Sequence, residues 1–227
     1  MIKNKKKLMF GLLGTLLLFS VIASSNDLIA LGKEGEQSRQ AIDVDYSNID
    51  WAVAEVLKEE SEILEEIKAI HDSNVSVQNL MKNASVSVKD MLDDQKTKFR
   101  FKVENKLING QENNDVELQK YVEKYNNNYL NAIEIAEKKY GVTVSQDEIT
   151  KYIEQNVSVI KIEEKEKYAK ALGLTVEELD YIFDRDIYLM DTLWEKLIPI
   201  LMEKHPQKDG EDQNLYLERI KKEFYGN

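Results

Sequence analysis

Apolar residues recur every three or four positions along most of the chain, which is the pattern of amphipathic helices. The pattern begins at Ser47, and Ser47 with Asp50 resembles a capping box with the shorter acid. A second apolar segment covers residues 77–103, and Ser87 is placed to break it and to cap a new helix. We therefore expect helices from the first residues of this pattern onward.

Glycine and capping signals divide the second half of the chain. Residues 109–115 read as a turn, and the helix that follows should end at Gly141 in a left-handed cap. Ser145 with Glu148 and Thr175 with Glu178 are full capping boxes. The expected helices are 116–140, 146–156, 163–172, a long one at 176–204, and 214–224. The pattern predicts an all-α, multi-helix bundle with a long C-terminal helix.

The N-terminus has the pattern of an export signal. Four lysines within residues 1–7 precede an uncharged apolar run, 8–23, which ends in small residues. We expect residues 1–25 to be a signal peptide cleaved after Ser25, or alternatively an uncleaved membrane anchor, since 16 apolar residues fall short of the roughly 20 that span a bilayer. Residues 26–46 lack a sustained period and are expected to form a tether, followed by a helical domain at 47–227. Either alternative places that domain outside the cytoplasm, because positive charge stays inside.

Composition narrows the possible functions. Residues 26–227 carry 27 basic and 42 acidic side chains, a net charge of −15, which argues against nucleic-acid binding. The chain has no cysteine, so disulfides, thiolate metal sites and a lipid-modified cysteine are excluded. No catalytic or phosphate-binding motif is present, and His71 and His205 stand apart without a metal-ligand spacing. We therefore expect no enzymatic activity, no cofactor and no metal.

The long helix at 176–204 carries our candidate binding residues. Asp186 falls within its apolar stripe, where a lone carboxylate is costly, so we expect it to pair with a lysine or arginine or else to face a wet groove. Tyr181 and Tyr188 lie seven residues apart on the opposite, polar face, where exposed tyrosines suit contact with peptides. Trp194 lies on the apolar stripe. With scattered surface tyrosines as the alternative, we assign peptide binding to Tyr181, Tyr188, Trp194 and Asp186.

Two stretches resemble a known family. They are AEKKYGVTVSQDEITKYIEQ at 136–155 and YAKALGLTVEELDYIFDRD at 168–186. In this order they resemble the N-terminal chaperone region of the SurA-type family, to which exported foldases of the PrsA type are related. The resemblance covers about 115–204, and the first half of the chain matches weakly.

The resemblance implies a helical module that binds unfolded or partly folded polypeptides outside the cytoplasm. Members often continue into a parvulin-type prolyl isomerase domain, for which this sequence leaves no room, so we expect no isomerase activity. We expect contact with a membrane only through residues 8–24, if they stay uncleaved. The alternative is a membrane-anchored structural protein that binds one specific cell-envelope partner.

Overall fold

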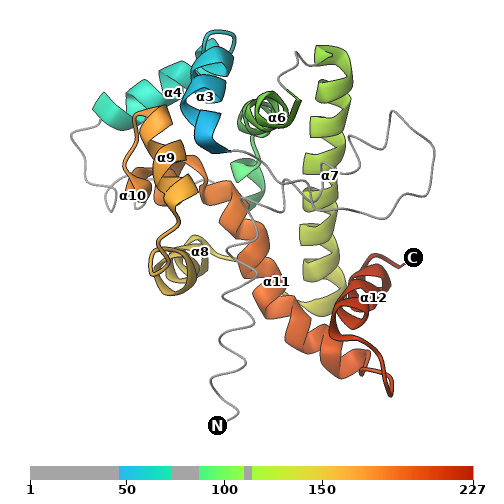
Figure 1. Cartoon of the computed structure of the whole chain (residues 1–227). Coiled ribbons are helices and arrows are strands. Elements are labelled where there is room, and N and C mark those ends of the chain that lie inside the picture. The colour runs from blue at the N-terminus through green and yellow to red at the C-terminus, as the bar shows by residue number, and fades with distance from the viewer. Residues whose placement is uncertain (1–45, 73–86, 110–113, 227) are drawn as a thin grey trace.

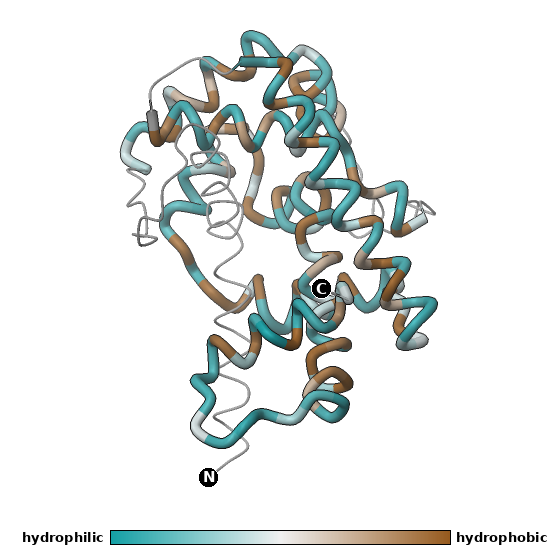
Figure 2. Tube along the Cα trace, turned by 90° about the vertical axis from the view of Figure 1, so that its right-hand side faces the viewer, coloured by the Kyte–Doolittle hydropathy of each residue, from teal (hydrophilic) through white to brown (hydrophobic). Residues whose placement is uncertain are grey.

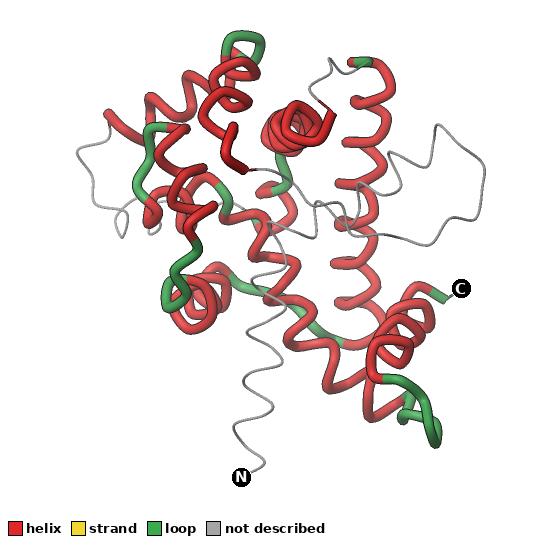
Figure 3. Tube along the Cα trace, viewed as in Figure 1, coloured by secondary structure: helices red, strands yellow, loops and turns green. Residues whose placement is uncertain are grey.

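The computed structural model describes residues 46–72, 87–109 and 114–226. The expected leader and almost all of the tether, like the first ten residues of the segment at 77–103, lie outside the described residues. Within them the chain is all-α and has no strand (Figure 3). The α-helices are α3 (Ile49–Leu57), α4 (Ser61–Asp72), α6 (Asp94–Asn109), α7 (Asp115–Tyr140), α8 (Gln146–Tyr152), α9 (Glu163–Leu172), α10 (Val176–Glu178), α11 (Arg185–Lys204) and α12 (Gln213–Tyr225). Short 3-10 helices η1 (Tyr46–Asn48) and η2 (Val88–Met91) and π-helical turns η3 (Ile153–Val157) and η4 (Leu179–Phe183) complete the order.

The local signals in the second half of the chain are confirmed. Gly141 and Gly173 cap α7 and α9 with φ angles of 65° and 74°, a backbone conformation that costs glycine nothing. Ser145 and Thr175 both form the complete capping box with the glutamate three residues on. These features form locally because each partner lies within six residues along the chain.

The expected beginning of the first helix was wrong. Ser47 lies in η1, and α3 follows Asn48 without a side-chain cap. The helical pattern is also divided, because the chain turns between α3 and α4 at Glu60, which is buried and lies 2.8 Å from Lys102 Nζ of α6. Ser87 does begin a helix, since its hydroxyl accepts from the Lys89 N–H at the start of η2.

The long helix expected at 176–204 is interrupted, and the interruption is the main correction to the secondary structure. It consists of α10, the π-helical turn η4 and α11, which meet at Asp184. The carbonyl of Phe183 accepts from Arg100 Nη2 (3.1 Å) and Lys96 Nζ (3.3 Å), and the Ile187 N–H donates to Asp184 instead. Side chains of α6 thus replace the backbone partner that a continuous helix would have supplied.

Within the part of the chain that the structure describes, four apolar clusters hold the helices together. The largest joins α3, α4, α6 and α9 with η4, around Val53, Phe99 and Phe183. In Figure 1 these helices form the upper part, with α6 seen end-on between α3 and α7. A second cluster joins the C-terminal half of α7 to α11 and α12, and a third packs α8 and η3 on the start of α11. The fourth packs Phe101 of α6 against α7.

The helices are amphipathic throughout. Figure 2 shows hydrophobic and hydrophilic residues alternating along each of them. Among the described helices, none combines the length and the apolar character that crossing a membrane requires. The long helix α11 contacts both the second and the third cluster. The candidate site is built around this helix.

Candidate functional site

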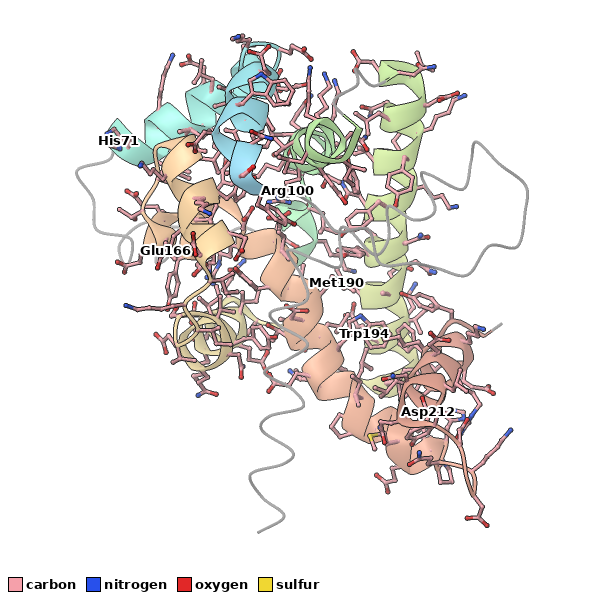
Figure 4. All side chains as sticks on the ribbon, viewed as in Figure 1. His71, Arg100, Glu166, Met190, Trp194 and Asp212 are labelled. Atoms are coloured by element: carbon pink, nitrogen blue, oxygen red, sulfur yellow. The ribbon has the colours of Figure 1, made fainter. Side chains whose placement is uncertain are left out.

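The four residues assigned to peptide binding occupy three different environments. Tyr188 was expected to be exposed, and this was wrong: only 7% of it is accessible, because the polar face of the helix is covered by α8 and η3. Tyr181 is half-buried beside them, with its hydroxyl 3.3 Å from that of Ser158. Trp194, which is labelled in Figure 4, packs edge-on against Phe224 of α12, with 5.1 Å between the ring centroids. The four do not form one surface.

Asp186 pairs with an arginine, which confirms the first of the two expectations. Arg100 of α6 donates from Nη1 and Nη2 to its two carboxylate oxygens, each at 2.7 Å, and from Nε to Asp184 at 3.0 Å. Arg100 lies in the middle of the molecule (Figure 4). The space beside this pair is only about 10 Å³, room for about one water, so there is no wet groove at Asp186.

One guanidinium faces two buried carboxylates, and this sets their pKa values apart. Burial raises the pKa of Asp184 to about 6, against the attraction of Arg100. Burial also acts to raise the pKa of Asp186, but the charge and the bidentate hydrogen bonds of Arg100 outweigh it and lower that pKa. The cluster fixes the break before α11 and offers no opening for a substrate.

A second buried ion pair lies on the other side of the break. Lys165 of α9 contacts the Asp180 carboxylate at 2.5 Å, and the Tyr188 hydroxyl donates to its other oxygen at 2.7 Å. Burial raises the pKa of Asp180 and of Tyr188. Tyr188 is therefore a partner in a structural pair rather than a surface group.

Asp191 on α11 is a further buried acid. The Tyr152 hydroxyl bonds to it, while its Oδ2 is buried without a partner, and burial raises its pKa well above the usual value. Within the described residues no group of three or more histidine, cysteine, aspartate or glutamate side chains could hold a metal ion. His71 in the last turn of α4 and His205 at the end of α11 both lie at helix ends, apart from these acids.

The candidate site is an apolar pocket of about 230 Å³ between α7, α11 and η2. The extended segment that joins α7 to α8 closes its fourth side. Its walls are aliphatic: Val88, Ile133, Val142, Val144, Leu189 and Leu193. Its remaining lining residues are Ser87, Lys89, Glu137 and Thr143.

The joining segment is held at both ends. At Gly141 the chain leaves α7 in the left-handed conformation, and the Val142 N–H donates to the Ala136 carbonyl at 3.0 Å. At the other end the Ser145 N–H donates to Glu148 at 2.8 Å. Lys196 of α11 bridges the segment and α8, because its Nζ lies 2.5 Å from both the Thr143 carbonyl and the Glu148 carboxylate. The pocket wall is thus preformed.

One ion pair lies at the edge of the pocket. Lys89 of η2 and Glu137 of α7 approach to 3.5 Å, and both side chains are about half exposed. An exposed pair at this distance contributes little to stability, so separating it costs little. A ligand could therefore enter between η2 and α7.

The sequence did not predict the pocket. It predicted the caps at Gly141 and Ser145, which flank residues 142–144, but it gave no indication of what those residues face. The partners come from helices about 50 residues away on each side, for which the sequence carried no signal. No family model matches the chain, and comparisons with curated proteins and with solved structures found no match.

Proposed function

We propose that this protein is a non-enzymatic, chaperone-like module that binds unfolded or partly folded polypeptides outside the cytoplasm. The observation that carries the proposal is the aliphatic pocket between α7, α11 and η2. An apolar pocket of about 150 Å³ admits a benzene ring, so about 230 Å³ has room for one large apolar side chain. It is smaller than the roughly 300–1,000 Å³ typical of sites for drug-sized ligands.

The sequence adds two supports. The lysine-rich start followed by the apolar run at 8–23 favours export. The resemblance of 136–155 and 168–186 to the SurA-type family favours client binding, and 136–155 includes Val142 and Val144 of the pocket wall.

The test is protection against aggregation. A denatured model protein is diluted with and without an equimolar amount of the purified chain, and light scattering is followed over time. We expect slower scattering for several unrelated clients. Absence of protection for all of them would contradict the proposal, and capture of one stable cell-envelope partner without general protection would favour the specific-interaction alternative.

A further inference from the structure

We propose that the pocket selects extended cationic segments, with one large aliphatic side chain in the pocket and flanking lysine or arginine side chains outside it. This inference rests on the proposed function and names the chemistry of the client. Three observations carry it: the lining of the pocket, the backbone of its wall, and the charges around its mouth.

The lining determines the side chain. Among the described residues that line the space, six are aliphatic and none is aromatic. Burying a leucine side chain in such a space favours binding, at about 25 cal/mol per Å² of apolar surface removed from water. An alanine would leave most of the pocket unfilled, so leucine, isoleucine or methionine is the fitting occupant.

The backbone of the wall favours an extended partner. Within the described part of the chain, neither the N–H nor the C=O of Val144 has a hydrogen-bond partner, although this residue lies between two fixed positions. Val144 is half-buried and Thr143 is exposed, so a peptide lying over the opening of the pocket can reach the backbone of this segment. An extended peptide can pair with such unpaired groups, and its side chains then alternate toward the pocket and toward solvent.

The charges around the mouth favour a cationic partner. Three lysines near the pocket have acidic partners: Lys89 with Glu137, Lys138 with Glu134, and Lys196 with Glu148. Two exposed acids remain, Asp90 of η2 and Asp147 in the first turn of α8, and neither forms an ion pair within the described residues. Arg185 at the start of α11 interacts electrostatically with Asp147, so three lysines, one arginine and five acids leave a local charge of −1 beside the pocket.

The whole chain reinforces this preference. Residues 26–227 carry a net charge of −15, which attracts basic segments and speeds their association. The same charge opposes a second copy of this chain as the occupant, because two such copies repel each other.

The first experiment measures the binding of short fluorescent peptides to the full-length chain in mild detergent, by fluorescence anisotropy. Three peptides differ in one property each: a lysine-glycine peptide with a central leucine, the same peptide with a central alanine, and a glutamate-glycine peptide with a central leucine. We expect the first to bind at least about tenfold more tightly than the second, because the alanine leaves the pocket unfilled. The first peptide should also bind more tightly than the third. This difference in affinity should disappear in 0.5 M salt, where exposed charges are screened.

Two variants locate the binding. Val144→Phe places extra bulk at the pocket wall and should weaken the leucine peptide at least about tenfold, toward the affinity of the alanine peptide. The matched control is Val116→Phe, an exposed valine in the first turn of α7 and outside the pocket lining, which should leave binding unchanged. If Val144→Phe fails to fold by circular dichroism, the double variant Asp90→Asn, Asp147→Asn replaces it and should reduce the preference for the cationic over the anionic peptide.

The outcomes separate this inference from the proposed function. Protection against aggregation with equal affinity for all three peptides would overturn the selectivity and leave the proposed function standing. If the chain shows no protection against aggregation and no peptide binding, both the inference and the proposed function are overturned. A concentration-dependent dimer that Val144→Phe abolishes would show that a second copy is the occupant and would overturn the inference.

Discussion

Replacing Asp184 by asparagine should change how the stability of this protein depends on pH. Asp184 is 3% exposed and shares the single Arg100 guanidinium with Asp186. Lys96, which lies on α6 with Arg100, donates to the carbonyl of Phe183 beside Asp184. Tyr168 and Asp180 are buried titratable groups that also lie near Asp184. Asparagine keeps an acceptor for Arg100 but cannot ionise.

The magnitude follows from the pKa of Asp184, which burial raises from 3.8 to about 6. Below the unfolded pKa the carboxyl is protonated in both states and costs nothing. As the pH rises through the folded pKa, the folded state loses stability relative to the unfolded chain, which ionises more readily. Two pKa units at 1.36 kcal/mol each make this loss about 3 kcal/mol, complete by about pH 7.

The assay is urea unfolding at pH 4 and pH 7.5, followed by far-ultraviolet circular dichroism. At pH 4 the unfolded carboxyl is already about half ionised, so part of the loss has occurred there. Between the two pH values the unfolding free energy of the parent chain should therefore fall by about 2.4 kcal/mol relative to that of D184N. Asp191, whose pKa burial also raises and whose pKa shift involves no contribution from Asp184, contributes equally to both proteins and cancels. The matched control D209N removes an exposed aspartate from the loop before α12 and should show no such difference. Parallel pH profiles for D184N and the parent would refute the reasoning.

Three further changes test other parts of the structure. Arg100→Met should lower the unfolding free energy at pH 7.5 by about 3–5 kcal/mol, because two buried carboxylates lose their cation; Lys138→Met, which breaks an exposed pair with Glu134, should cost much less, and equal losses would contradict this account. Gly173→Ala should cost about 1 kcal/mol, because alanine must adopt a φ of 74°, and an unchanged melting midpoint would speak against a left-handed cap. Mass spectrometry of the exported protein should find Asn26 as the first residue, whereas an intact leader would mean an anchor.

How much of the candidate site the sequence predicted depends on how far apart the interacting residues lie along the chain. The pairing of Asp186 could be expected, because a carboxylate within an apolar stripe needs a counter-charge, but Arg100 lies 86 residues earlier and nothing local identified it. The exposure expected for Tyr188 failed for a related reason. A polar helix face is exposed only if no other helix covers it, and here α8 and η3 do so.

The sequence by itself determined the capped helix ends in the second half of the chain, because capping boxes and left-handed glycine caps depend on neighbours within six residues. Ser145, Thr175, Gly141 and Gly173 all act in this way. Only the tertiary structure decided where the long helix breaks and where the pocket forms. Both depend on contacts between segments distant along the chain, and helical periodicity shows which face is apolar but not which helix will cover it.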